Sequence, residues 1–593
     1  MLRLVARLAR PALDFAVMQT GNRTVITGAN LVDGTGSPAR HADIAFVDGI
    51  ITEVGAPGSV STAHAHRHID AEGLLLTPGW VDVHTHYDAQ ATWDPWLTPS
   101  SWHGVTSVVM GNCGVGFAPA EPERHQWLID LMEGVEDIPG SAMVEGIKWE
   151  WTSFPEYLDA LERTPHVLDM GTQIAHGALR AFVMGDRGAA NEDATADDIA
   201  QMSAITEEAL RAGALGFSTS RTSLHRSKHG ELVPGTNAQP DELFGIADAM
   251  KRVGHGIFQF SPEHSRVPVD EWPWMQELAR RSGATVSVNV NQLDDGSEVW
   301  RKTLALLTKA HADGEKIVAQ TAGRSIGILM CLEGSVHPLL AHPAYHEVAH
   351  LPFAERIAAL KDPVRRARFV SEVPTDGFYN GLVTKSLHRM YPVTTSNIDY
   401  EPHPSTAIGE IAMRTGVAPM QLIVDHLLTN DGKGIIYSPF FNYIYGDLSM
   451  TYEMMQHPQT RNGLSDAGAH CGAICDGGMP TFMLTHWARD RTRGPKLSLE
   501  HIVYRQTRQT AEIHGLLDRG IVAPGMKADL NVINFDELGF DMPYMAYDLP
   551  AQGRRLVQTA RGYNKTFVSG LQTVENDAFT GELPGKLIRG PQR

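Results

Sequence analysis

The stretch that decides how this chain folds is Thr77-Pro-Gly-Trp-Val-Asp-Val-His-Thr-His-Tyr-Asp88. The apolar run around Val81 is typical of a short buried strand, and His84 and His86 follow it directly. Residues i and i+2 of a strand point to the same face, so the two imidazoles can converge on one metal ion. The plainer alternative is a pair of histidines at a polar loop mouth. The Pro78-Gly79 turn before the strand and the early position in a long chain favour the metal site.

Strand-like apolar runs recur through the centre of the chain and alternate with helical stretches. The clearest helix is predicted over 196–212, because Thr195 suits an N-cap, acidic residues occupy the first turn and Gly213 follows the last. Eight such strands predict an α/β fold, a (β/α)₈ TIM-like barrel with its chemistry at the C-terminal strand ends. The strands are expected near 78–83, 104–110, 167–175, 214–219, 256–261, 284–291, 316–321 and 462–466.

Both ends of the chain have short strands separated by turns. The dipeptide Asp48-Gly49 predicts a tight hairpin between two of them. We expect the two ends to form one small β-sandwich domain that brackets the barrel. The strands are expected at 25–27, 43–47, 50–54, 528–533 and 565–568.

The predicted domain division follows from this layout. Residues 20–76 and 518–593 form the small β domain, and residues 77–517 form the barrel, with a large insertion near 325–460 between its last two strands. Residues 1–19 form an N-terminal extension that carries three arginines among apolar residues. An amphipathic helix and a segment without a role both remain open for it.

Bulk composition excludes several classes of protein. The 593 residues carry 50 basic and 69 acidic side chains, a net charge of −19, which argues against a nucleic-acid partner. Four cysteines are too few for a disulfide framework in so long a chain, so we expect free thiols and a cytoplasmic protein. No apolar run reaches the ~18 residues of a membrane span. A small-molecule partner is expected, and homo-oligomer formation stays open.

Two further residues suit a metal centre at the strand ends. Cys113 follows the second strand in a glycine-rich turn, Gly111-Asn-Cys-Gly-Val-Gly116, that could aim a thiolate inward. Its alternative is a buried structural cysteine. Asp466 lies at the end of the eighth strand, where a carboxylate beside an activated water could take a proton and return it to a leaving amine. Its alternative is a helix N-cap.

Three residues at other strand ends are candidates for binding a substrate. His176 ends the third strand, Arg221 follows the fourth and Arg324 follows the seventh. A guanidinium binds carboxylates through two parallel hydrogen bonds, so either arginine would suit an anionic substrate. A loop histidine without a role and ordinary ion pairs are the alternatives.

Together these residues resemble the amidohydrolase superfamily, and more closely a divergent branch of the N-acyl-D-amino acid deacylases (D-aminoacylases). Pro-Gly-x-x-Asp-x-His-x-His, at 78–86, is specific for the superfamily, and Gly-Asn-Cys-Gly, at 111–114, for the aminoacylase-like branch. The similarity covers almost the whole chain. It includes residues 28–36, 104–114, 213–219, 465–466, 520–530 and 580–585.

The resemblance implies a metal-bearing (β/α)₈ barrel and a small β domain made of both chain ends. It assigns His84 and His86 as metal ligands from the first strand, Cys113 as a metal-bound thiolate, and Asp466 as the catalytic acid/base and a further ligand. The cofactor expected is a divalent metal, one or two ions, with zinc favoured because imidazole, thiolate and carboxylate all suit it.

The chain also departs from the family. Where the family places metal-binding histidines at the ends of strands five and six, our alignment puts Ser261 and Asn291, and neither is a usual transition-metal ligand. His264 lies close to the first of these positions, and His470 closes the segment that holds Asp466. We count both, with the three residues named above, as candidates for substrate binding.

The sequence therefore predicts a metal-dependent amidohydrolase that cleaves a carbon–nitrogen amide bond of an N-acyl amino acid or a related amide. A cyclic amide or imide hydrolase of the same superfamily is the first alternative. A metal-free, non-catalytic homologue is the alternative from another class, motivated by Ser261 and Asn291. The acyl group, the amine and the stereochemistry stay open.

Overall fold

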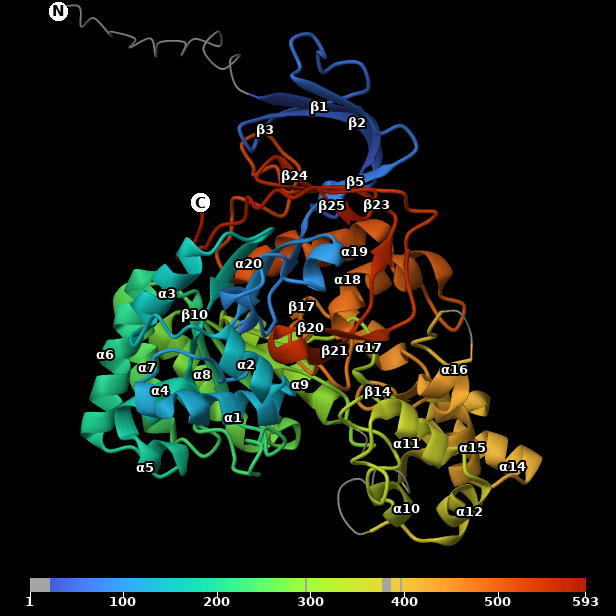
Figure 1. Ribbon diagram of the computed structural model, residues 1–593. Coiled ribbons are helices and arrows are strands. Elements are labelled where there is room, and N and C mark those ends of the chain that lie inside the picture. The colour runs from blue at the N-terminus through green and yellow to red at the C-terminus, as the bar shows by residue number, and fades with distance from the viewer. Residues whose placement is uncertain (1–21, 294–295, 376–384, 395–396) are drawn as a thin grey trace, which may run out of the picture.

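The computed structural model describes residues 22–293, 296–375, 385–394 and 397–593, so the predicted extension at 1–19 lies outside the described residues. In Figure 1 a β-rich part built from both ends of the chain stands above a mixed α/β body. A group of helices from the middle of the chain, α10 to α16, lies beside that body at the lower right.

The body is a barrel of eight parallel strands, as the sequence predicts. One sheet joins β6, β7 and β8, and a second has the order β17-β13-β12-β11-β10-β9. A parallel bridge between Thr85 and Ala467 joins the first strand to the last and closes the barrel. The strands are β6 (Trp80–Asp82), β7 (Val105–Met110), β8 (Asp169–Thr172) continued by β9 (Ile174–Ala175), β10 (Gly216–Ser220), β11 (Ile257–Ser261), β12 (Thr285–Asn289), β13 (Ile317–Thr321) and β17 (Thr460–Asn462).

The predicted eighth strand is wrong in its limits. The strand β17 ends at Asn462, so most of the predicted span 462–466 follows it as a loop. This loop begins with Gly463 and contains Leu464 and Asp466 with positive φ angles of 58° and 47°, which a strand does not tolerate. Asp466 therefore lies just beyond the C-terminal end of the barrel, where (β/α)₈ enzymes keep their catalytic residues.

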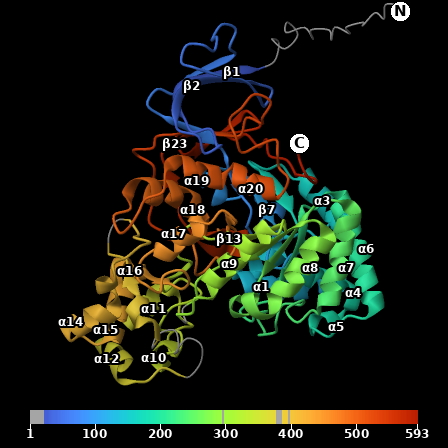
Figure 2. The ribbon, with the colours of Figure 1, turned by 180° about the vertical axis from the view of Figure 1, so that it is seen from behind.

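Helices surround the barrel, as Figure 2 shows from behind. The predicted helix at 196–212 is present as α6 (Ala196–Ala212), with a capping box between Thr195 and Asp198 and with Gly213 at its end. The other helices outside the long insertion are α1 (His125–Glu136), α2 (Gly140–Gly146), α3 (Phe154–Arg163), α4 (His176–Met184), α5 (Asp186–Ala189), α7 (Pro240–Val253), α8 (Trp272–Ser282), α9 (Val299–Ala312), α18 (Met479–Phe482), α19 (Leu499–Gln506) and α20 (Arg508–Ile513).

The two chain ends share one nine-stranded sheet. Its order is β25-β24-β23-β18-β5-β1-β2-β3, with β4 paired to β1, so the C-terminal strands form one half of the sheet, the N-terminal strands form the other, and the halves meet where β18 pairs with β5. The edges of Phe46 and Phe567 meet with their ring centres 5.6 Å apart, which packs two parts of the curled sheet face to face. The strands are β1 (Arg23–Leu31), β2 (Arg40–Val47), β3 (Ile50–Gly55), β4 (Arg67–Asp70), β5 (Leu75–Pro78), β18 (Leu530–Ile533), β23 (Tyr563–Val568), β24 (Leu571–Glu575) and β25 (Ala578–Phe579).

The predicted hairpin at Asp48-Gly49 joins β2 to β3, and both residues have positive φ angles of 48° and 83°. Two further pairs of C-terminal strands reach back over the barrel. They are β19 (Gly539–Phe540) with β22 (Ala560–Arg561), and β20 (Tyr544–Leu549) with β21 (Gly553–Val557). The backbone N–H of Leu556 in β21 donates to the carbonyl of Cys471, so this part of the chain contacts the loop that carries Asp466.

A long insertion separates β13 from β17 and has its own apolar core, which includes Leu339, Phe369 and Ile423. Its strands form a small antiparallel sheet of order β14-β16-β15. The elements are β14 (Gly327–Met330), α10 (Pro343–His346), α11 (Phe353–Leu360), α12 (Pro363–Ser371), β15 (Tyr391–Pro392), α14 (Ile408–Thr415), α15 (Pro419–Leu427), α16 (Thr429–Gly432), β16 (Ile436–Pro439) and α17 (Ser449–Gln456).

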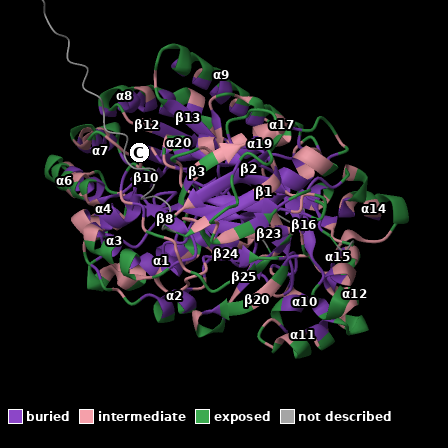
Figure 3. Cartoon of the chain, turned by 90° about the horizontal axis from the view of Figure 1, so that it is seen from above, coloured by how far each residue is buried: buried purple, intermediate pink, exposed green. Residues whose placement is uncertain are grey.

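Burial follows this layout. Figure 3 shows the strands as buried and the outer helix faces as exposed. All four cysteines are free and buried, as expected. Within the part of the chain that the structure describes, no helix combines the length and the apolar character that crossing a membrane requires.

Candidate metal centre

The first and last barrel strands bring His84, His86 and Asp466 together through their backbones. The N–H of His86 donates to the carbonyl of Ala467 at 2.8 Å, and the N–H of Asp466 donates to the carbonyl of His84 at 3.1 Å. These two bonds cross between segments that are almost 400 residues apart in sequence. They hold the Asp466 carboxylate against both imidazoles.

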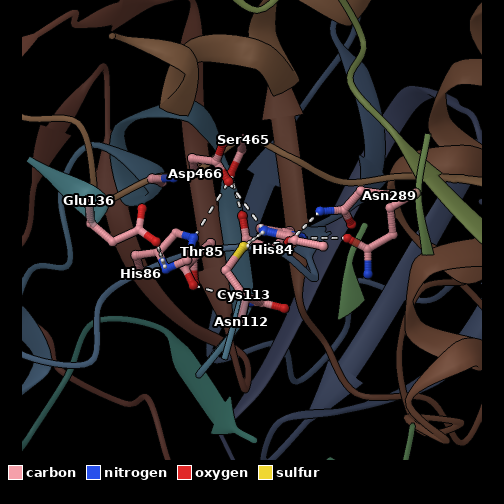
Figure 4. Close-up of polar contacts among 12 residues, drawn as sticks. His84, Thr85, His86, Asn112, Cys113, Glu136, Asn289, Ser465 and Asp466 are labelled. Atoms are coloured by element: carbon pink, nitrogen blue, oxygen red, sulfur yellow. Dashed lines mark hydrogen bonds and ion pairs between the residues drawn. The ribbon is translucent and has the colours of Figure 1, made fainter. Parts of the chain in front are cut away.

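Four side chains converge at this point, as Figure 4 shows. Nε2 of His84 lies 3.4 Å from Oδ1 of Asp466, and Nε2 of His86 lies 3.6 Å from the same oxygen. Sγ of Cys113 lies 3.2 Å from Nε2 of His84. The ligand atoms of the two histidines and the cysteine all lie within 4.8 Å of one another.

Unusual backbone conformations aim two of these side chains. Cys113 has a φ of 57° between Gly111 and Gly114, which also have positive φ, and Asp466 has a φ of 47°. A left-handed non-glycine residue costs on the order of 1–3 kcal/mol and persists where the surrounding structure imposes it. Such strain is concentrated at functional sites, and here it falls on two of the four converging residues.

The four groups shift one another's pKa values. Burial alone would lower the pKa of His84, but the Cys113 thiolate and the Asp466 carboxylate raise it to about 9. Burial also opposes the charged form of His86, yet Glu136 and Asp466 raise its pKa well above the usual value. The same two imidazoles outweigh burial to lower the pKa of Cys113 and of Asp466.

The donor set fits a divalent metal ion. Two imidazole nitrogens, one thiolate and one carboxylate are the ligand types that zinc and related metals take. The thiolate and the carboxylate carry two negative charges, which would balance one dication in a site where both histidines are almost fully buried. The Asp466 side chain is 15% exposed, so water can reach it.

Two supporting residues were missed by the sequence reasoning. Glu136, at the end of α1, places one oxygen 3.4 Å from Nδ1 of His86 and the other 3.6 Å from Nε2 of His470. The Gln320 amide oxygen lies 2.6 Å from Nδ1 of His84. A carboxylate or amide oxygen at the outer ring nitrogen fixes the tautomer and leaves Nε2 free for a metal.

A signal for Glu136 exists in the sequence. Leu128, Met132 and Glu136 stand at i, i+4 and i+8 of one helix, so the helical period places the glutamate on the buried apolar stripe. A carboxylate is rarely buried without a partner, which makes its position informative. The glutamate is only 2% exposed, and its partners are His86 and His470.

The strand-five and strand-six positions hold neutral residues beside Cys113. Ser261 Oγ donates to the Cys113 sulfur at 3.1 Å, and Asn289 Nδ2 donates to Ser261 Oγ at 2.9 Å. Asn291, which the sequence alignment placed at the strand-six position, instead accepts a hydrogen bond from Asn442 at 3.0 Å. Asn289 is therefore the strand-six residue that joins the site.

His176 and Arg221 lie outside this cluster, between the strands and the helices. The two ring nitrogens of His176 contact Thr219 at 2.8 Å and Glu242 of α7 at 2.7 Å. Arg221 donates to the carbonyl of Ala238 at 2.6 Å. On β10, Ser218 bonds the Cys113 turn, so the alternate residues Thr219 and Arg221 point the other way.

Arg324 is also engaged elsewhere. It is fully buried, donates to Asp476 at 2.8 Å and lies over the ring of Tyr400 at 3.5 Å. Burial outweighs this pairing at the carboxyl and raises the pKa of Asp476 to about 6. The structure does not bring this arginine to the four converging side chains.

Three further histidines are not among the four converging side chains. His470 is one-quarter exposed and contacts Glu136. His264 packs its ring 6.1 Å from that of Phe441. His225, which the sequence reasoning did not select, bonds Ser220 at 2.9 Å, and burial lowers its pKa to about 4 although Glu136 and Asp466 are near enough to oppose that shift.

Known proteins are similar to this chain over most of its length. The model of the amidohydrolase family matches residues 67–574. The D-aminoacylase of Alcaligenes xylosoxydans xylosoxydans is 37% identical, with 95% of this chain and 97% of the relative covered. The N-acyl-D-aspartate deacylase of the same organism is 26% identical, with 98% and 97% covered.

Solved structures support the fold. A D-aminoacylase structure, determined to study the functional role of a binuclear metal center, superimposes with a TM-score of 0.63 at 22% identity. The alignment covers 96% of this chain and all of that one. At this identity the likeness concerns the architecture, which is the predicted barrel with a β-sandwich domain.

Proposed function

This chain belongs to the amidohydrolase family, and from this premise we propose that it hydrolyses the amide bond of an N-acyl amino acid with the help of a divalent metal ion. The observation that carries the proposal is the convergence of His84, His86, Cys113 and Asp466 at the C-terminal end of the barrel. These four residues would hold the ion. Zinc is the metal that this mixed set of nitrogen, sulfur and oxygen donors favours.

When bound, a divalent ion would polarise the amide carbonyl and lower the pKa of the attacking water. The chain itself supplies the proton transfer. Asp466 has a pKa below the usual value, so it is present as a carboxylate, the form that can accept a proton from water. Its partial exposure leaves room for that water, and the same carboxyl group would then donate the proton to the leaving amine nitrogen.

The remaining contacts keep the site in one arrangement. Gln320 forms a hydrogen bond with Nδ1 of His84, and the Glu136 carboxylate lies 3.4 Å from Nδ1 of His86, so both would keep the Nε2 atoms directed at the common point. Ser261 donates to the Cys113 sulfur and supports its thiolate form. We propose these three as positioning residues, because none of them needs to contact a substrate.

Two relatives that match over nearly the whole chain are named D-aminoacylase and N-acyl-D-aspartate deacylase, which supports an N-acyl-D-amino acid as the substrate class. Arg221 and Arg324 are engaged with other groups, so neither is part of the proposed carboxylate recognition. His470 and His264 remain the proposed polar groups near the opening of the site. The chain is divided, in this proposal, into a barrel and a composite β domain. The four free thiols favour the cytoplasm as its compartment.

The test is a substrate panel with matched variants. Purified protein, loaded with zinc, is assayed for free amine on N-acyl-D-amino acids, their L-isomers and cyclic amides. We expect amine release from the linear D-compounds, loss of activity in His86→Ala and full activity in His229→Ala, a histidine that is 60% exposed and pairs with Asp130. Ring opening alone would favour the cyclic amide hydrolase. No turnover of any compound by fully loaded protein would refute the proposal.

A further inference from the structure

A closed ring of hydrogen bonds lies beside the Cys113 thiol. The N–H of Cys113 donates to Gln259 Oε1 at 3.0 Å, and Gln259 Nε2 donates to Asn289 Oδ1 at 3.3 Å. Asn289 Nδ2 donates to Ser261 Oγ at 2.9 Å, and Ser261 Oγ donates to the Cys113 sulfur at 3.1 Å. The ring therefore begins and ends on one residue.

The three other members come from the inner face of two neighbouring strands. Gln259 and Ser261 stand at i and i+2 of β11, and Asn289 ends β12, which pairs with β11 in parallel. All three are buried or nearly so, with exposures of 0%, 4% and 7%. The oxygens that could serve as ligands on this side are thus enclosed and already hydrogen-bonded.

A second ion at Cys113 would have to break this ring. Amide and hydroxyl oxygens are weak ligands for transition metals, whereas imidazole and carboxylate are strong ones. Among the described residues, the group that could hold a metal contains His84, His86 and Cys113, and it draws nothing from β11 or β12. Breaking the ring would exchange four hydrogen bonds for poor coordination.

The balance of charge also argues against a second ion at Cys113. The Cys113 thiolate and the Asp466 carboxylate supply two negative charges, which balance one dication. A second dication would leave two positive charges uncompensated in a buried site, which is costly. The buried Glu136 carboxylate faces Nδ1 of His86 and Nε2 of His470.

We infer that this centre binds one divalent ion, and that the Gln259–Asn289–Ser261 ring is what excludes a second ion from Cys113. The inference rests on the proposed function for the identity of the centre. It sets this chain apart from the D-aminoacylase whose structure was studied for a binuclear center.

The experiment is a titration of metal-free full-length protein with Co²⁺. Thiolate-to-cobalt absorption reports coordination by Cys113, and elemental analysis after gel filtration reports the ions retained per chain. For the wild type we expect both readouts to saturate at one equivalent. Two equivalents retained by the wild type would overturn the inference and leave the proposed hydrolase intact, whereas no retained metal would overturn both.

Two double variants test the role of the ring. Ser261→His with Asn289→His places two imidazoles beside the sulfur and should raise the retained metal to two equivalents. Ser261→His with Asn291→His is the matched control, because Asn291 faces Asn442, and it should stay at one. Circular dichroism confirms that each variant is folded before titration. A folded Ser261→His, Asn289→His protein that still binds one ion would overturn the role of the ring.

Discussion

Glu136→Gln is the substitution that most directly tests how the site is supported. It keeps the size of the side chain and removes its negative charge from two contacts, at 3.4 Å to His86 and at 3.6 Å to His470. Two unit charges 3.4 Å apart attract by about 5 kcal/mol at an effective dielectric constant of about 20. His86 would be neutral as a metal ligand, so only a part of this energy applies.

Carboxylates behind metal-binding histidines typically change metal affinity by about 10- to 100-fold, which is roughly 1.4–2.7 kcal/mol. We expect Glu136→Gln to weaken metal binding by an amount in that range, measured by competition against a chromophoric chelator at fixed pH. Glu133→Gln is the control, since Glu133 lies one turn earlier on α1 and contacts the exposed Lys228 at 3.2 Å. Equal affinity in the two folded variants would refute the role given to Glu136.

Three further substitutions test the chemistry and the stability. The amide of Asp466→Asn cannot take a proton, so kcat for amine release should fall by about 10²- to 10⁴-fold. An unchanged kcat in the metal-loaded variant would contradict the role of Asp466 as the acid/base. Arg519 lies 2.6 Å from the buried Asp169, so Arg519→Met leaves Asp169 with Lys527 as its ion-pair partner. The free energy of unfolding, measured with urea, should fall by about 3 kcal/mol, and an unchanged value would show that the Arg519–Asp169 pair is not stabilising. In Glu401, burial opposes ionisation, but His486 and Arg491 lower the pKa from 4.5 to about 2. Its contribution of about 3 kcal/mol is therefore present above pH 4.5 and lost as the pH falls towards 2, and Glu401→Gln should flatten that part of the acid-unfolding curve.

The functional residues at the first two strand ends could be predicted because each lies in a short continuous motif directly after its strand. His84 and His86 follow an apolar run directly, and Cys113 follows the next strand in a glycine-rich turn. The barrel then brings such ends together whatever the length of the connections. Asp466 was found in spite of a misplaced strand, because the loop after β17 still begins at the end of the barrel that carries the site.

Strand alternation could have corrected one further prediction but not another. Ser218 and Ser220 share one face of β10, so Arg221 belongs to the opposite face, towards the helices. The same alternation cannot choose between Asn289 and Asn291, which share a face; only the path of the chain beyond β12 separates them. Asn291 is drawn to Asn442, a residue of the long insertion, and no local pattern contains that contact.

Backbone hydrogen bonds of the barrel position the side chains of the site. The hydrogen bonds that join His84 to Asp466 and His86 to Ala467 also close the barrel between its first and last strands. The four side chains are therefore positioned by the same contacts that complete the fold. Glu136 and Gln320 contact the Nδ1 atoms of His86 and His84. Because these contacts are backbone hydrogen bonds of the barrel itself, we expect the barrel to form without the ion, in contrast to small domains that fold only around their metal. The left-handed conformations of Cys113 and Asp466 are then a cost that the closed barrel offsets.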